Sequence, residues 1–329
     1  MPSPTLKPAT HDLQHTLEQH RPELIAHCYR MLASPFEAED AVQEAFVRAW
    51  RGFERFEGRS TLRSWLYSIA TNVCLDMLSG RERRARPMDL GPAGSPAVAE
   101  LNTLPEATWI QPIPDSRVTP SGGDPADVAI SRETIRLALI AALQHLPPRQ
   151  RAALILCEVL QWKASEVAEL LETSVPAVNS ALQRARATLA SAKIQQSDQT
   201  TPVDAASRAL LTRYVDAFQR YDLDALTALI HDDATQSMPP HDLWLHGRRD
   251  ILEWWFGAGI GCRGSRVLPA STANGSPAFG QYKPSPGGGY EPWALQVIEL
   301  SAGRIREFSF FLDTAPLFPL FGLPARLDA

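Results

Sequence analysis

Side chains suited to binding an unpaired nucleobase lie on one predicted helix near the N-terminus. Apolar residues mark one side of the sequence from Leu62 to Met77, as expected of an amphipathic helix. The other side carries polar and aromatic side chains: Arg63, Tyr67, Thr71 and Asn72. The run RERRAR (residues 81–86) follows and contains four arginines. Aromatic rings stack on unpaired bases, and arginines hold the adjoining phosphates. The pattern favours a nucleic-acid ligand, whereas each aromatic residue taken singly favours a place in the core.

A second group of polar side chains has the spacing needed to reach base edges in duplex DNA. Residues 163–190 predict two short helices separated by a three-residue turn, Glu172 to Ser174, which is helix-turn-helix spacing. The exposed face of the second helix carries groups that bond bases and phosphates: Asn179, Ser180, Gln183, Arg184 and Arg186. One good bidentate base contact in a major groove is worth about 1–3 kcal/mol. A plain helical hairpin with a solvated polar face is the alternative.

A third group forms an acidic stripe on a helix predicted over residues 37–50. Apolar residues recur at helical spacing and should form its core face: Val42, Ala45, Phe46, Ala49 and Trp50. The acidic residues Glu37, Asp40 and Glu44 fall on a different face. The pattern alone favours a solvated surface for this stripe.

Length and composition limit the number of domains and the class of protein that can position these groups. The chain has 329 residues, enough for two domains or three small ones. Hydrophobic residues make up 44% and charged residues 21%, as in ordinary globular proteins. The net charge of −5 argues at face value against binding nucleic acid through the overall field. Residues 131–193, with 8 basic and 5 acidic side chains, form the only positive segment, and it contains the predicted helix-turn-helix.

Proline and glycine divide the chain into segments. Residues 86–125 contain eight prolines and four glycines, a density that disfavours a packed core. We therefore expect domains at 10–86, 131–194 and 203–315, a linker at 87–130 and an apolar tail at 316–329. No segment resembles a membrane span or a signal peptide, so we expect a cytoplasmic protein without a membrane partner. The four cysteines lack metal-ligand spacing, and we expect neither a metal nor a cofactor.

The two helical segments together resemble a known family. Residues 38–78 (AEDAVQEAFVRAW through NVCLDML) are similar to region 2 of group 4, extracytoplasmic-function (ECF) type, sigma-70 factors, and residues 146–189 (LPPRQ through RATL) are similar to their region 4. The resemblance implies two all-α domains that bind core RNA polymerase and promoter DNA. It assigns polymerase binding to Asp40, Gln43 and Glu44. It also implies a pocket that captures an extruded base of the −10 element, for which we expect contributions from Phe56, Ser60, Trp65, Tyr67, Asn72 and Arg83. The −35 element would be read by Asn179, Ser180, Gln183, Arg184 and Arg186.

The C-terminal segment predicts helices followed by a curved antiparallel sheet, an α+β cone. Its sequence YVDAFQRYDLDALTALIHDDA (residues 214–234) resembles SnoaL-like domains, some of which catalyse proton transfer in a pocket. Residues that could do so are His231, Asp232, Asp233, His241 and His246. The tail segment LFPLFGLP (317–324) could dock on a partner or pack on its own domain.

These resemblances predict a non-catalytic sigma factor whose C-terminal domain adjusts its activity, with an intramolecular contact between that domain and the sigma domains. The linker segment TWIQPIPD (108–115) resembles a motif found in sigma factors with an added C-terminal domain, and we expect it to follow an extended path. Two alternatives remain at this point. One is a helix-turn-helix regulator that acts without polymerase, and the other is a small-molecule enzyme or sensor that uses the C-terminal domain.

Overall fold

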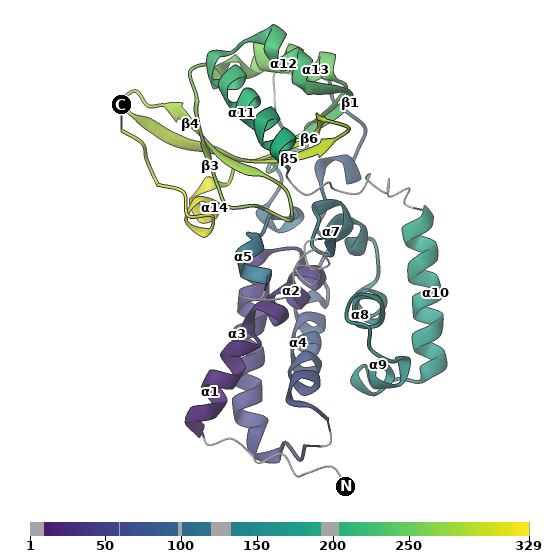
Figure 1. Cartoon of the computed structure of the whole chain (residues 1–329). Helices are drawn as coiled ribbons and strands as arrows, with labels where there is room; N and C mark the ends of the chain where they lie inside the picture. Colours follow the sequence, from purple (N-terminus) through teal and green to yellow (C-terminus); the bar gives the residue numbers. More distant parts are fainter. Residues whose placement is uncertain (1–9, 59, 98–100, 120–132, 192–203, 329) are drawn as a thin grey trace. The chain divides into compact units, whose positions relative to one another are not determined.

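The computed structural model describes residues 10–58, 60–97, 101–119, 133–191 and 204–328. The chain divides into two compact units. Unit one comprises residues 1–84 and 110–194, and unit two comprises residues 85–109 and 195–329. Figure 1 shows helices in unit one and a sheet with flanking helices in unit two.

Unit one begins with a bundle of helices: α1 (Thr10–Gln19), α2 (Arg21–Leu32), α3 (Pro35–Gly52) and α4 (Leu62–Leu78), with a short 3₁₀ turn η1 (Phe53–Arg55). Two side chains cap helices as N-cap residues should, because each accepts a backbone N–H that has no partner within the helix. Ser34 Oγ accepts from Glu37 N (3.4 Å) at α3, and Thr61 Oγ1 accepts from Ser64 N (3.1 Å) at α4. The predicted core face of α3 is confirmed except at Trp50, which is 46% exposed. Ala49 in the same last turn is fully buried, so only one side of this turn leaves the core.

The rest of unit one contains the helix-turn-helix. Its helices are α5 (Asp115–Val118), α7 (Leu137–Gln144), α8 (Pro148–Leu154), α9 (Ala164–Leu170) and α10 (Val175–Ser191), and α8 continues into the π-helical turn η4 (Ile155–Val159). Helices α9 and α10 confirm the predicted pair. The buried side of α10 carries Val178, Leu182 and Ala185. Glu172 in the turn has φ +50°, a left-handed conformation that favours glycine.

Unit two is built on a mixed sheet in the order β2-β1-β6-β5-β4-β3. The strands are β1 (Ile230–Ser237), β2 (Trp244–His246), β3 (Arg266–Pro269), β4 (Ala278–Pro284), β5 (Tyr290–Ser301) and β6 (Arg304–Phe311). Strands β1 and β6 run parallel, and the other neighbours run antiparallel. The α+β class is confirmed, but the sequence did not indicate β1 or β2. Strand β1 is rich in polar residues (IHDDATQS) and is recognisable only in the folded sheet.

Helices cover both faces of this sheet. On one face α11 (Ala205–Arg220), α12 (Leu223–Leu229) and α13 (Arg248–Phe256) enclose an aromatic core in which Tyr214, Phe218, Trp255 and Phe308 meet. A 3₁₀ turn, η5 (Ala258–Cys262), follows α13. On the other face α14 (Thr314–Leu320) and the residues after it pack against β4 and β5.

The apolar tail packs on its own domain. The rings of Tyr282 and Phe318 meet edge to face with centroids 5.1 Å apart, and Tyr282 Oη donates to Pro324 O (2.8 Å). Leu323 fills the space over Gly280, where an added Cβ would lie 2.7 Å from a leucine methyl. Of the two possibilities for this segment, the structure has the packing on its own domain, since Leu317, Phe318, Phe321 and Leu323 are buried.

The proline-rich segment does not stay outside the packed units. Residues 85–109, with the 3₁₀ turns η2 (Pro87–Asp89) and η3 (Glu106–Thr108), belong to unit two, where Trp109 is 3% exposed. From Ile110 the chain belongs to unit one: Tyr29 Oη donates to Gln111 O (2.7 Å), and Ile113 is fully buried. The expectation that prolines keep the whole of 87–130 from packing is thus wrong for its described part. Residues 120–130 lie outside the described residues.

Candidate nucleic-acid and polymerase interface

A pocket in unit one brings together three of the predicted −10 residues. Phe56, Ser60 and Trp65 line it with Arg55 and Glu57, and its volume is about 290 Å³. The rings of Phe56 and Trp65 stack with centroids 4.8 Å apart and an interplanar angle of 30°. Flat apolar walls beside hydroxyl and charged groups suit a single planar ring system with polar edges, such as a nucleobase. The sequence reasoning missed Arg55 and Glu57, although both are neighbours of Phe56 in the chain.

The other side of α4 differs from the expectation. Asn72 is exposed as predicted, but Tyr67 and Thr71 are 1% and 0% exposed. Helix α2 and the second half of unit one both cover this side: His27 of α2 contacts Thr71 (2.9 Å) and the Tyr67 ring, and Trp162 meets the Tyr67 ring edge to face. Burial raises the pKa of the Tyr67 phenol well above its ordinary value. Tyr67 is therefore buried in this conformation of unit one and supports the surface of α4 from within.

Glu23 on α2 joins several groups near Tyr67. Its carboxylate accepts from Arg63 Nη2 (2.7 Å) and Tyr67 Oη (3.2 Å), and it lies 2.6 Å from His20 Nδ1. Burial alone would raise the pKa of Glu23, but the hydrogen bonds from His20 and Arg63 outweigh it and hold the pKa below its ordinary value. This ionised carboxylate fixes Arg63, one of the cations predicted to hold phosphate, at the surface of α4.

The four arginines of residues 81–86 are already partnered. Arg81 and Arg84 both pair with Glu37 of α3, at 2.7 and 3.1 Å. Arg83 Nη1 lies 2.6 Å from His145 Nδ1. Arg86 belongs to unit two and pairs with Asp89 (3.4 Å). Glu37 is thus part of an internal ion-pair group, and the available acidic stripe on α3 is shorter than the sequence indicated.

The predicted polymerase-binding residues lie on the open face of α3. Asp40, Gln43 and Glu44 are all exposed. Glu44 pairs with Arg48 one turn along (2.8 Å), whereas Asp40 has no ion pair in the part of the chain that the structure describes. The result is an acidic and polar surface backed by a rigid core, since Ala41, Val42 and Ala45 beneath it are fully buried.

The predicted recognition surface on α10 is open. Asn179, Gln183, Arg184 and Arg186 are exposed, and Ser180 is partly buried. Arg184 Nη1 donates to Ser180 Oγ (2.6 Å), which holds the guanidinium along the helix. Arg186 pairs with Glu158 of η4 at 2.6 Å. Asn179 and Gln183 make no side-chain hydrogen bond within the described ranges, so their amides are free to bond a ligand.

Comparison with known proteins identifies the family. The sigma-70 region 2 family matches residues 16–84, sigma-70 region 4 matches 136–189, and the SnoaL-like domain matches 211–308. The ECF RNA polymerase sigma factor SigG of Mycobacterium tuberculosis is 44% identical over 312 residues, which cover 94% of this chain and 83% of that protein. The chain belongs to the ECF RNA polymerase sigma factor family.

Two further relatives agree. The probable ECF RNA polymerase sigma factor SigI of M. tuberculosis is 29% identical over 213 residues, 64% of each chain. The crystal structure of M. tuberculosis SigJ, an ECF sigma factor, has the same fold, with a TM-score of 0.58 at 22% identity over 96% of this chain and 99% of that one. In the described part of this sigma factor no helix is long and apolar enough to cross a membrane.

The candidate acid–base residues of the SnoaL-like domain are exposed or half-buried. They lie along β1, β2 and the loop between them, at positions 231, 232, 233, 241 and 246. Asp232 pairs with Arg248 (2.5 Å), and His241 Nδ1 lies 3.1 Å from Thr103 Oγ1 of the linker. The first contact stabilises the surface of the domain, and the second attaches the linker to it.

Beside the aromatic core, the interior of the cone contains a network of neutral hydrogen-bonded side chains. Tyr214 Oη donates to Gln296 Oε1 (3.0 Å), and Gln296 Nε2 donates to Gln281 Oε1 (2.9 Å). Gln281 continues the chain to Ser265 (3.0 Å), and all four side chains are buried. Burial raises the pKa of Tyr214 well above its ordinary value, so this network carries no group that exchanges a proton near neutral pH.

Proposed function

We propose that this ECF sigma factor binds core RNA polymerase through the exposed face of α3 and reads promoters with two surfaces of unit one. Asp40, Gln43 and Glu44 would contact polymerase. The pocket of Phe56, Ser60 and Trp65 would receive one extruded base of the −10 element. The observation that carries the proposal is this aromatic pocket, because a structural core has no need of stacked rings at an open cavity.

The free energy of base capture requires a contribution from a partner, core RNA polymerase. Extruding a base costs a few kcal/mol, and stacking on one aromatic ring returns about 1–3 kcal/mol. Phe56 and Trp65 already stack on each other, so the base would stack on the free side of one ring. Ser60 and the charged groups of Arg55 and Glu57 supply hydrogen bonds to its edge. The remaining free energy would come from polymerase, which fits a sigma factor with a net charge of −5 that binds promoters weakly when alone.

The other −10 residues would act at a distance from this pocket. Asn72 lies two helical turns beyond Trp65 on α4 and is exposed, so it suits the neighbouring nucleotide. Arg83 would exchange His145 for a phosphate. Tyr67 would position Arg63 and the α4 backbone rather than touch DNA.

The −35 element would be read by α10 in the major groove. Asn179 and Gln183 carry unpaired amides suited to base edges, whereas Arg184 is held in place by Ser180. Arg186 would leave Glu158 for a phosphate, a small cost because exposed ion pairs contribute about 0–1 kcal/mol.

The SnoaL-like domain would adjust initiation without catalysing a reaction. Its neutral interior supports this role, as does its hold on residues 85–109, which continue directly from region 2. The predicted contact between this domain and the sigma domains stays a prediction.

Run-off transcription with core polymerase tests the proposal. The variants Trp65→Ala and Phe56→Ala should reduce open-complex formation at least tenfold, the equivalent of about 1.4 kcal/mol lost from stacking, while polymerase binding is unchanged. Trp293→Ala removes an exposed tryptophan of unit two and is the matched control. Failure of the wild-type chain to direct initiation at any promoter of its source genome would overturn the proposal.

A further inference from the structure

Two stretches of the linker lie over the loop that joins β1 to β2, all within unit two. We call residues 91–97 and 101–104 the linker arch. One end is fixed by Trp244, whose carbonyl accepts from Gly94 N (2.8 Å) and whose Nε1 donates to Gly91 O (2.9 Å). The other end is fixed where Leu104 N donates to Pro240 O (3.0 Å). The first residue of β2 therefore holds one end of the arch, and the loop before it holds the other.

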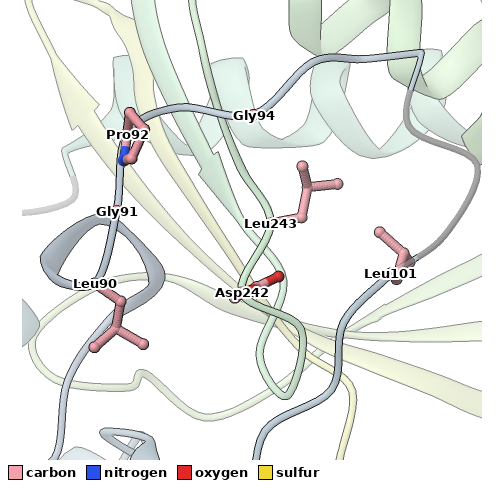
Figure 2. Close-up of a pocket in the computed structure, with 7 residues that line it drawn as sticks. All are labelled: Leu90, Gly91, Pro92, Gly94, Leu101, Asp242 and Leu243. Carbon is pink, nitrogen blue, oxygen red and sulfur yellow. The ribbon is translucent and has the colours of Figure 1, made fainter.

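A pocket of about 290 Å³ lies between the linker and the loop. Figure 2 shows the linker passing Leu243 at Gly94 and returning at Leu101, with the leucine side chains of residues 101 and 243 turned toward each other. The pocket is lined by Leu90, Gly91, Pro92, Gly94, Leu101, Asp242 and Leu243. A Cβ at position 94 would lie 2.5 Å from Leu243 Cδ1, so glycine is what allows the linker to pass this closely.

The lining is apolar except for one carboxylate. Asp242 Oδ2 accepts from Asn102 Nδ2 (2.8 Å), a neutral donor. Asp242 has no ion pair with any residue that the structure describes, although the other exposed acids of this strand region, Asp232 and Asp233, face arginines. An apolar pocket with a single uncompensated carboxylate matches a ligand that has an apolar body and a cationic head.

We propose that this pocket binds a small organic amine, protonated at neutral pH and carrying about one ring, and that the bound amine holds the linker arch on the SnoaL-like domain. A cavity of about 150 Å³ accommodates benzene in another protein, so 290 Å³ is sufficient for a ring with a short aminoalkyl chain. The amine contacts both the arch and the loop. It therefore binds only when the arch is in place, and mass action makes the attached state more populated as ligand is added. The inference is independent of the polymerase and promoter contacts proposed above.

Calorimetric titration of the full chain tests the pocket with two probes of one shape. The probes are 2-phenylethylamine, which is protonated at pH 7, and 2-phenylethanol, its neutral counterpart. The amine should bind at one site and about fivefold more tightly than the alcohol, the value of one solvent-accessible ion pair. Hydrogen exchange of peptides that cover residues 90–104 should slow when the amine is added. Equal affinity for the two probes, or unchanged exchange in this segment, would contradict the proposal.

Variants locate the binding site. Asp242→Asn keeps an oxygen that can accept from Asn102 but removes the charge, so it should weaken amine binding about fivefold and leave alcohol binding unchanged. Leu90→Trp places a larger ring at the exposed rim and should abolish binding of both probes. The matched controls are Asp224→Asn and Leu223→Trp on α12, both at exposed positions of the same unit outside the pocket lining. Wild-type amine affinity in Asp242→Asn or Leu90→Trp would exclude this pocket as the site.

Discussion

The indole of Trp162 meets the phenol ring of Tyr67 edge to face, with ring centroids 5.6 Å apart. Trp162 immediately precedes the helix-turn-helix, and Tyr67 lies on the helix that carries the −10 pocket. The contact therefore joins the two parts of unit one to which we assign promoter reading. Under the proposed function these parts bind separate sites along one duplex, and we expect this contact to open when both are engaged.

Removing the indole should loosen this junction. We expect Trp162→Ala to lower the free energy of unfolding of unit one by about 1–3 kcal/mol, from lost burial and the lost aromatic pair. Hydrogen exchange in α4 near Tyr67 should accelerate at the same time. Trp50→Ala, which removes an exposed tryptophan at the end of α3, should change neither quantity appreciably. Unaltered exchange in α4 would show that the ring pair does not hold the two parts together.

The left-handed residue in the helix-turn-helix offers a stabilising substitution. Glu172 is exposed and has φ +50°, so replacing it by glycine removes the steric cost of a Cβ in this conformation. Glycine also raises the conformational entropy of the unfolded chain, which cancels part of this stabilisation. We expect Glu172→Gly to raise the free energy of unfolding by about 0.5–1 kcal/mol in urea titrations. Glu169→Gly in the preceding helix should lower it by about 1 kcal/mol, because φ there is helical. A loss of stability in Glu172→Gly would contradict this account.

Buried His27 should make unit one sensitive to mild acid. Burial, followed by the nearby Arg30 charge, lowers the pKa of His27 to about 3. The ring lies against Thr71, whose hydroxyl already donates to Tyr67 O, so His27 Nε2–H is the donor to Thr71 (2.9 Å). The unfolded chain takes up a proton near pH 6.5 and the folded chain does not. Stability is thus complete above pH 6.5 and falls toward pH 3, by up to about 1.4 kcal/mol per pH unit.

Chemical denaturation between pH 7 and pH 5 measures this slope. Glu23, whose pKa is held below its ordinary value, loses its contribution only at lower pH, so it does not obscure the result. His27→Gln retains a donor for Thr71 and should abolish most of the slope. His15→Gln, at an exposed position of α1, should leave it intact. A variant at residue 27 with the wild-type slope would assign the titration to another group.

The ion pair between Glu158 and Arg186 predicts an effect on DNA affinity. Glu158→Gln releases the Arg186 guanidinium, so holoenzyme should bind −35 DNA about two- to fivefold more tightly at low salt, with the gain lost at high salt. Fluorescence anisotropy with a labelled duplex measures the change. Glu169→Gln, on the neighbouring helix α9, removes an equal charge without releasing an arginine. If both variants gain equally, net charge rather than Arg186 is responsible.

Sequence periodicity predicted those helices and strands that are determined by residues close together in the chain. The helix-turn-helix and most of the core face of α3 follow from 3.6-residue spacing, and the helices and four strands of the cone follow from local apolar runs. These features require only residues that are close in sequence. The grouping of Phe56, Ser60 and Trp65 came from the family resemblance and not from periodicity.

Features that depend on distant partners could not be predicted in this way. The pattern of α4 alone predicts that Tyr67 and Thr71 are exposed, yet His27 of α2 covers Thr71, and His27 and Trp162 both contact the Tyr67 ring. Strand β1 is polar and becomes a strand because β6 pairs with it. The acid–base candidates are exposed or half-buried. Their positions were set by the sheet, and the interior was taken by glutamines that carry no motif.

The division of residues 85–109 from the rest of unit two has a consequence during synthesis. This segment leaves the ribosome at least 86 residues before residue 195, and 220 residues before the chain reaches 329. Its hydrogen-bond partner Trp244 is made 135 residues after residue 109, a wait of roughly 7–27 s at about 5–20 residues per second. Region 2 and region 4 are complete before then. A newborn chain therefore passes through an interval in which both matched sigma regions exist but Trp244, the partner of Gly91 and Gly94, has not been made, which makes translation rate a determinant of when the linker is first restrained.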